Sequence, residues 1–207
     1  MRTNPYRMLV LAFTAALTIP AAAPAHADST GALAKTTREY VDVDDCDAGA
    51  NFVGGGGELG NANFHFDPHN TTIVLVKTDR GTWKASSKLS WTYNDAESGN
   101  LLRIPRWTPV TAAEKKVLKT YESALLAHEN GHHKVAKDYM AAAAKTLVEE
   151  GATKAEAVDK LSAKADQYSD HVDRELTAKT RAYDQTTDHG RNQAALGGKN
   201  VELNCPA

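Results

Sequence analysis

The chain has 207 residues, of which 42% are hydrophobic and 24% are charged, the balance of a globular protein with a core rather than of a disordered or fibrous chain. Its formal net charge is −2 with histidine neutral, which excludes the strongly basic surface that marks many nucleic-acid-binding proteins. The length fits one domain of ordinary size.

The first 27 residues have the pattern of a secretory signal peptide. Arginines precede a largely apolar stretch, residues 8–23, and the small residues of Ala25-His26-Ala27 form a cleavage site. The alternative, a membrane anchor, fits less well because two prolines interrupt a stretch that is already short for a span. Removal of residues 1–27 takes away two arginines and no acid, so the net charge changes from −2 to −4. We expect residues 28–207 to form a single secreted, extracytoplasmic domain with no membrane span and no nucleic-acid partner.

The two cysteines, Cys46 and Cys205, lie near opposite ends of the expected mature domain. An isolated pair of cysteines usually forms a disulfide in the oxidising compartment that an exported protein enters. The alternative is two free, buried thiols. Their wide separation in sequence makes them poor metal ligands, so we expect a disulfide bond between them.

Residues 28 to about 110 have the pattern of strands and turns. Several segments alternate apolar and polar residues with a period of two, and one is a β-branched run. Together they predict an antiparallel sheet of four to five strands, with a short final strand close to the C-terminus. The segments are 39–44, 63–67, 71–77, 83–93 and 101–107, and the final strand is 201–203.

From Thr111 the sequence becomes helical in character. Capping boxes of the form Thr-x-x-Glu begin at Thr111 and Thr153, and each marks the start of a helix. Apolar residues at helical spacing predict helices over about 111–151 and 154–182. The short connection between them predicts an antiparallel helical hairpin. The expected fold class is therefore α+β, with the sheet packed on the first helix and on a second long helix.

The sequence His128-Glu129-Asn130-Gly131-His132 is an HExxH motif on the first predicted helix. Residues four apart lie on one helix face, so both imidazoles can bind one zinc ion. Glu129 can reach a metal-bound water and act as its general base. Gly131 is unfavourable in a helix interior, which predicts close backbone packing beside the metal. His133 is expected to point away from the metal, into solvent. The alternative is that the histidines are ordinary residues of a helix face and that Glu129 is solvated.

A catalytic zinc ion needs a third protein ligand and an open fourth position. The segment Tyr183–Gly190, which follows the second predicted helix, is the best source of that ligand. If both helices are continuous, a rise of ~1.5 Å per residue puts the point opposite His132 near residue 172, so the segment must curl back over the site. That register leaves two alternative ligands, His171 and Glu175.

The two motifs together resemble a family of bacterial exported proteins described as predicted secreted zinc-dependent proteases, formerly a domain of unknown function. The pattern of that family joins HExxH to a downstream Tyr-Asp-x-x-Thr-x-His-Gly segment. The resemblance covers about residues 38–195, and it implies hydrolysis of peptide bonds at one zinc ion per chain in a zincin-like fold. The downstream residues that match are Tyr183, Asp184, Thr187, His189 and Gly190.

Residue by residue, the resemblance implies that the histidines of HENGH are the first two zinc ligands, His128 and His132, and that Glu129 is the base. His189 is then the third ligand, and Asp184 is its main rival. If His189 binds the metal, Asp184 or Asp188 can orient an imidazole ring from behind.

Tyr183 has two possible roles: a hydrogen bond to the oxyanion of a tetrahedral intermediate, or packing as a core residue at a helix end. Gly190 is expected to supply a turn with positive φ.

The expected function is a secreted zinc metallopeptidase whose zinc-bound water, deprotonated by Glu129, attacks a peptide or protein substrate paired with a sheet edge. Two alternatives stay open: a zinc amidase that acts on cell-wall peptides, and a non-catalytic secreted metal-binding module. The oligomeric state cannot be read from the sequence.

Overall fold

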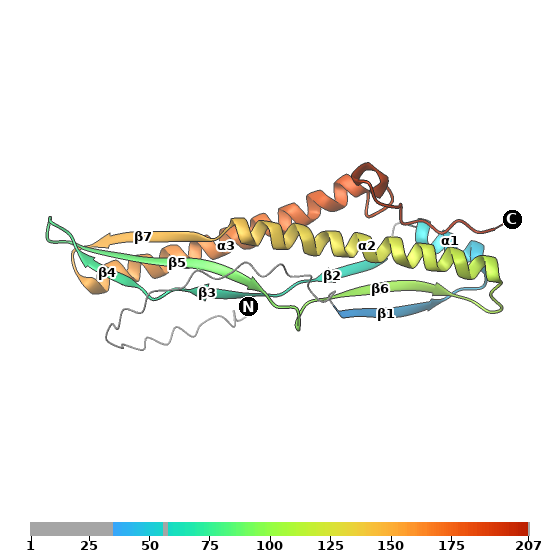
Figure 1. The fold of residues 1–207 in the computed structure, drawn as a ribbon, viewed down its shortest axis with the longest axis horizontal. Helices are drawn as coiled ribbons and strands as arrows, with labels where there is room; N and C mark the ends of the chain where they lie inside the picture. Colours follow the sequence, from blue (N-terminus) through green and yellow to red (C-terminus); the bar gives the residue numbers. More distant parts are fainter. Residues whose placement is uncertain (1–34, 56–57, 207) are drawn as a thin grey trace. The chain divides into compact units, whose positions relative to one another are not determined.

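Three α-helices, seven β-strands and one short 3₁₀ helix (η1) make up the part of the chain that the computed structural model describes, residues 35–55 and 58–206 (Figure 1). All of these residues belong to one unit, Ala32–Ala207. The predicted signal peptide, residues 1–27, lies outside the described residues. No helix in the described part combines the length and the apolar composition that a membrane span requires. In chain order the elements are β1 (Lys35–Asp42), α1 (Cys46–Gly54), β2 (Gly60–Asn63), β3 (Phe66–Asn70), β4 (Val74–Lys77), β5 (Trp83–Tyr93), β6 (Gly99–Arg106), α2 (Ala112–Ala142), β7 (Lys145–Gly151), α3 (Lys154–Thr187) and η1 (Gln193–Leu196).

The first sheet has β6 at its centre. β2 pairs with β6 antiparallel, but β1 pairs with it in parallel, so the prediction of a purely antiparallel sheet is wrong here. Alternation with a period of two indicates which face a residue occupies, but it says nothing about the direction of the partner strand. Leu102 and Ile104 of β6 are buried in a core that also contains Tyr121 and Leu125 of α2. This contact places the middle of α2 against the mixed sheet.

The second sheet is antiparallel and has β5 at its centre, with the bounds that the sequence predicts for that strand. β4 and β7 both pair with the beginning of β5, so they occupy its opposite edges. β3 pairs with the end of β5. Leu147 of β7 and Leu161 of α3 are buried in one cluster with Ala85 and Leu89 of β5. α3 is thereby held on this sheet.

The first long helix is shorter than the sequence predicts. α2 ends at Ala142 rather than at Gly151, and the following residues form β7. Helix-forming residues such as Lys and Glu are common in this segment, yet pairing with β5 and burial of Leu147 outweigh their helical propensity. α1 is also missed by the pattern analysis. It begins after Asp45, whose carboxylate accepts a hydrogen bond from the backbone N–H of Ala48 at 2.7 Å.

The strand β7 changes the register between the two long helices. Extended chain rises ~3.3 Å per residue, whereas a helix rises ~1.5 Å. The nine residues after Ala142 are mostly extended, so they reach ~16 Å further than the helix that the sequence predicts there. Helix α3 needs about 11 additional residues to return over that distance. In Figure 1, β7 continues beyond the end of α2 before α3 returns. The point of α3 opposite His132 therefore moves from near residue 172 to near residue 183. No curling back of the chain is needed.

The C-terminal tail is tied to α1. The predicted disulfide is present and joins Cys46, at the start of α1, to Cys205 in the tail. Val201 and Leu203 of the tail are buried in the same core as Tyr121 of α2. The predicted final strand is absent at residues 201–203, which have no regular secondary structure. The tail nevertheless contributes buried side chains to the core.

Candidate metal centre

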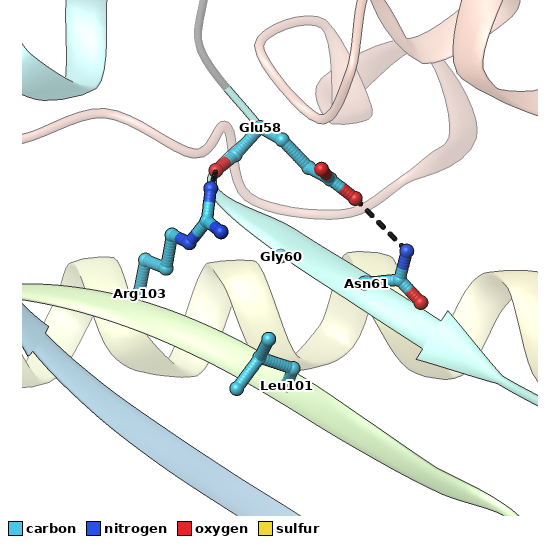
Figure 2. A pocket seen from close by; sticks show the side chains of 5 residues that line it. All are labelled: Glu58, Gly60, Asn61, Leu101 and Arg103. Atoms are coloured by element: carbon cyan, nitrogen blue, oxygen red, sulfur yellow. Dashed lines mark hydrogen bonds between the residues drawn. The ribbon is translucent and has the colours of Figure 1, made fainter.

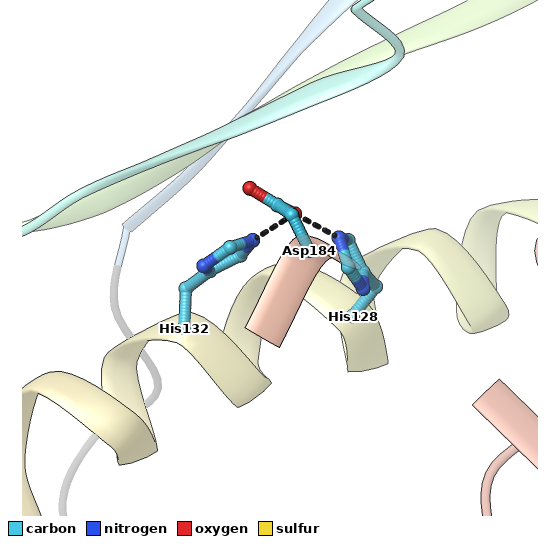
Figure 3. A group of neighbouring side chains, drawn as sticks. All are labelled: His128, His132 and Asp184. Carbon is cyan, nitrogen blue, oxygen red and sulfur yellow. Dashed lines mark ion pairs between the residues drawn. The ribbon is translucent and has the colours of Figure 1, made fainter. Parts of the chain in front are cut away.

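Three side chains converge between α2 and the last turns of α3. The Nε2 atoms of His128 and His132 lie 3.3 Å and 2.9 Å from Oδ1 of Asp184 (Figure 3). One ligand atom from each of the three residues lies within 4.8 Å of the others. Both histidines are buried, and Asp184 is partly exposed. Two imidazoles and one carboxylate thus form a group of the size and chemistry that can hold a metal ion.

The geometry brings Asp184, rather than His189, between the two histidines. His189 has a side chain that is 73% exposed, with Nδ1 3.7 Å from Oδ1 of Asp184. Asp188 is the exposed C-terminal cap of α3. The other two alternatives, His171 and Glu175, are exposed on α3 and do not join the group.

Burial favours the neutral form of both histidines. It lowers the pKa of His128 to about 4, an effect that the neighbouring His132 reinforces and the carboxylate of Asp184 opposes. Burial also lowers the pKa of His132, again against the carboxylate. Neutral imidazole is the form that binds metals. Near neutral pH both rings are therefore already neutral, so no proton has to be removed before they bind a cation.

Glu129 is 3% exposed and lies between α2 and the start of β2. Gly60 of β2 is so close that a Cβ atom there would overlap the Glu129 carboxylate. Burial raises the pKa of Glu129 to about 8, and the negative charges of Asp184 and Glu58 act in the same direction. A carboxyl group in this environment can exchange a proton near neutral pH.

Tyr183 packs against both histidine rings. Its ring is stacked on that of His128, with centroids 5.2 Å apart, and meets that of His132 edge to face at 4.8 Å. Its hydroxyl lies over Gly131, where a Cβ atom would overlap it, so the predicted close packing at this glycine is confirmed. The side-chain amide of Gln193 finds partners for both its oxygen and its nitrogen in one orientation. In that orientation its oxygen accepts hydrogen bonds from the Tyr183 hydroxyl at 3.3 Å and from the backbone N–H of His128 at 3.1 Å. This geometry matches the packing role expected for Tyr183.

The turn after α3 is left-handed over three successive residues. The φ angles are 47° at Asp188, 52° at His189 and 89° at Gly190, which confirms the positive φ predicted for the glycine. A Cβ atom at Gly190 would lie 2.6 Å from Cγ2 of Val201 and 3.2 Å from Cγ of His128. Only a residue without a side chain fits this position easily.

His133, expected in solvent, is in fact buried on the far side of α2. The Tyr93 hydroxyl and His133 Nδ1 are 2.7 Å apart, and His133 Nε2 lies 2.8 Å from Oδ1 of Asn100. Asn100 also donates from Nδ2 to Oδ1 of Asn130 at 3.0 Å. Asn130 and His133 thus fix the motif helix to β5 and β6 from behind. No local sequence signal could have found this, because the partners of His133 are 33 and 40 positions away in sequence.

A small pocket lies on the other face of the mixed sheet, where Leu101 and Arg103 alternate with the buried residues of β6 (Figure 2). Its volume is about 220 Å³. Asn61 donates to the Glu58 carboxylate at 2.9 Å, and Nη1 of Arg103 donates to the backbone carbonyl of Glu58 at 3.0 Å. These two hydrogen bonds hold Glu58, just before β2, in place. His128, His132 and Asp184 are not part of the lining of this pocket.

The chain was also compared with known proteins. A family model described as "Bacterial protein of unknown function (DUF922)" matches residues 82–190, a span that includes the HExxH motif and ends at Gly190. No curated protein and no solved structure matches the chain. Because the family model covers more than half of the sequence, the chain belongs to this family of bacterial proteins of unknown function.

Proposed function

We propose that the protein is an exported, zinc-dependent metallopeptidase with a zincin-like active-site helix. The observation that carries this proposal is the convergence of His128, His132 and Asp184 beside a buried carboxyl group that is not part of the group, Glu129. A structural metal site has no use for such a base. A hydrolytic site requires one.

The donor set fits zinc. Two imidazole nitrogens and one carboxylate oxygen are a ligand combination of catalytic zinc sites, in which a fourth position stays open. The same combination also suits ferrous iron. The buried Glu129 favours hydrolysis over oxidation, because oxidation at iron needs no general base at this position. When bound, zinc supplies a Lewis acid and lowers the pKa of coordinated water.

The side chains around this group have separate tasks in the proposed reaction. Glu129 takes a proton from the attacking water and passes it to the leaving amine, a task that fits a buried carboxyl group beside the candidate ligands. Tyr183 and Gly131 fix the histidine rings by close packing. Asp184 is the proposed third ligand in place of His189, since it is the residue that lies between the two histidines.

The proposed substrate is an extended peptide. Within the described residues, β2 is an edge strand of the mixed sheet, and its first residue, Gly60, touches Glu129. An extended peptide can pair with such an edge through backbone hydrogen bonds. Export is supported by the leader-like residues 1–27 and by the Cys46–Cys205 disulfide, since disulfides persist mainly outside the cytosol.

The test uses the full chain, expressed with its leader and purified from the extracytoplasmic fraction. We expect about one zinc ion per chain and hydrolysis of unfolded protein substrates. Glu129→Ala should keep the zinc and lose activity, Asp184→Ala should lose both, and the exposed His171→Ala should keep both. An active Glu129→Ala protein would contradict the proposal. Cleavage of cell-wall peptides but not of proteins would instead identify the protein as an amidase that acts on cell-wall peptides.

A further inference from the structure

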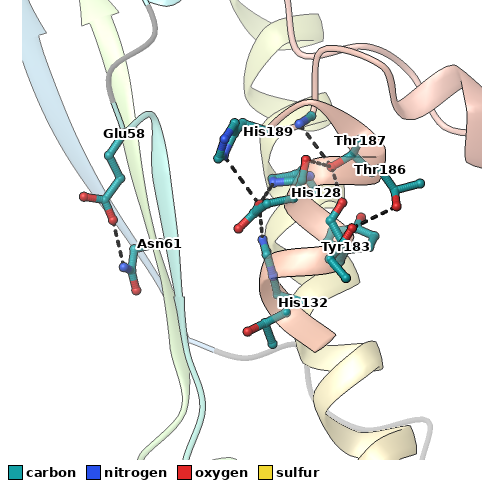
Figure 4. A network of polar contacts seen from close by, with 12 residues as sticks. Glu58, Asn61, His128, His132, Tyr183, Thr186, Thr187 and His189 are labelled. Atoms are coloured by element: carbon teal, nitrogen blue, oxygen red, sulfur yellow. Dashed lines mark hydrogen bonds and ion pairs between the residues drawn. The ribbon is translucent and has the colours of Figure 1, made fainter. Parts of the chain in front are cut away.

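His189 occupies the side of the metal-binding group that faces β2. Figure 4 shows its ring on that side, whereas Tyr183 lies on the opposite side. The side chain of His189 is 73% exposed, although Nδ1 is only 3.7 Å from Oδ1 of Asp184. The two ligand histidines, in contrast, are buried. His189 is therefore next to the centre without being enclosed in it.

The backbone holds His189 in an unfavourable conformation. Asp188 and His189 are consecutive non-glycine residues with positive φ, and the backbone N–H of His189 donates to the carbonyl of Asp184 at 2.9 Å. Left-handed conformations are disfavoured for residues with a side chain, and such outliers gather at functional sites. A glycine at position 189 would relieve this conformation.

The other candidate donor is occupied on the opposite side. The Tyr183 hydroxyl is engaged by Gln193 and lies over Gly131, between the ligand rings and η1. It is not presented to the side of β2. Tyr183 is the residue expected to stabilise a substrate oxyanion, but His189 is the one whose side chain is exposed and can face a substrate.

We infer that His189 is not a metal ligand but donates a hydrogen bond to the substrate carbonyl oxygen at the open side of the centre. The inference rests on the proposed function, because it assigns a role in the same hydrolysis. Donors aimed at the developing oxyanion typically change kcat by about 10²–10³-fold. A fourth protein ligand, by contrast, would close the position that the reaction needs.

The test compares His189→Ala, His189→Gln and His189→Gly with Asp184→Ala. We measure zinc affinity by competition with a chelator, the visible spectrum of the Co²⁺-substituted protein, and kcat and KM separately. The His189 variants should bind zinc within about threefold of the parent with an unchanged Co²⁺ spectrum, because the ligand set is intact. In His189→Ala, kcat should fall about 10²–10³-fold with little change in KM, and His189→Gln should recover part of it. His189→Gly should keep or raise Tm by about 2–4 °C, since it relieves the positive φ.

Two results would overturn the inference: zinc affinity reduced by about tenfold or more with an altered Co²⁺ spectrum, which would make His189 a ligand, or an unchanged kcat. If the parent protein cleaves no peptide, the proposed function fails separately. The Co²⁺ spectrum still decides whether His189 is a ligand. Binding of a phosphinic peptide, a mimic of the tetrahedral oxyanion, then decides its role as a donor: weaker binding to His189→Ala supports the inference, and equal binding overturns it.

Discussion

Val201 donates its backbone N–H to the carbonyl of Gly190 at 2.9 Å, and its side chain packs against the same glycine. On the same side of Gly190 lies the ring of His128, since one Cβ atom there would meet both Val201 and His128. The C-terminal tail therefore packs, through this glycine, beside a histidine of the candidate metal site. Since the tail continues through the buried Leu203 to Cys205, the disulfide anchors the segment that packs beside the candidate metal site.

Removing this disulfide should weaken both the fold and the metal centre. In Cys46→Ser/Cys205→Ser the loop of 159 residues is no longer closed. The chain-entropy model puts the loss of unfolding free energy at about 5 kcal/mol, and zinc affinity should fall as the tail loosens. Urea unfolding and chelator competition measure the two effects. A stable double variant with unchanged zinc affinity would show that the buried tail residues hold the turn without the disulfide.

Gly190→Ala should be more damaging than Gly197→Ala. Both glycines have positive φ, but a Cβ atom at Gly197 would meet nothing within 4 Å, whereas one at Gly190 would meet Val201 and His128. Gly197→Ala therefore measures the conformational cost alone, about 1 kcal/mol. Gly190→Ala should lower the unfolding free energy by about 2–4 kcal/mol and weaken zinc binding, because the new methyl group also overlaps its neighbours. Equal losses in the two variants would mean that the contacts at Gly190 relax freely.

Replacement of Gly131 tests the packing of Tyr183 against the ligand rings. In Gly131→Ala the new methyl group overlaps the Tyr183 hydroxyl, so the tyrosine must move away from His128. We expect a loss of about 1–3 kcal/mol in unfolding free energy, in spite of alanine's better helical propensity. Tyr183→Phe removes the hydroxyl and should restore part of the loss in the double variant. If the loss of unfolding free energy in the double variant equals the sum of the losses in the two single variants, this contact is not the cause.

How far the sequence predicts the site depends on the range of the interactions involved. The HExxH spacing is local, so His128 and His132 can be proposed as ligands, and Glu129 as a base, from one helix turn. The position of Asp184, the proposed third ligand, depends on β7, whose pairing with β5 joins residues more than 50 positions apart. Helical periodicity carries no information about that pairing. Without β7, the sequence places residue 172 opposite His132, whereas the structure places Asp184 there. The burial of His133 is missed for the same reason, since both its partners come from distant strands.

The buried Glu129 makes the stability of the metal-free protein depend on pH in a defined direction. Its pKa in the folded protein is about 8, above the ordinary value of 4.5. Between these values the folded protein holds a proton that the unfolded chain has released, so the contribution of Glu129 is complete below pH 4.5 and is lost as the pH rises through 8. Burial also lowers the pKa of His128, which makes the unfolding free energy increase with pH below pH 6.5. This effect is the same in the parent protein and in a variant at Glu129, so it does not affect their difference.

Glu129→Gln should therefore stabilise the metal-free protein at alkaline pH. Glutamine keeps the shape and the neutral state of the protonated side chain and cannot ionise. The difference in unfolding free energy between variant and parent should stay below about 1 kcal/mol at pH 5 and grow to roughly 2–4 kcal/mol at pH 8. Urea unfolding of the chelator-treated proteins at pH 5, 6, 7 and 8 measures it, with Glu175→Gln on the exposed face of α3 as the matched control. A difference that is constant over this range would mean that Glu129 is ionised in the folded, metal-free protein throughout, and that burial does not raise its pKa as far as 8.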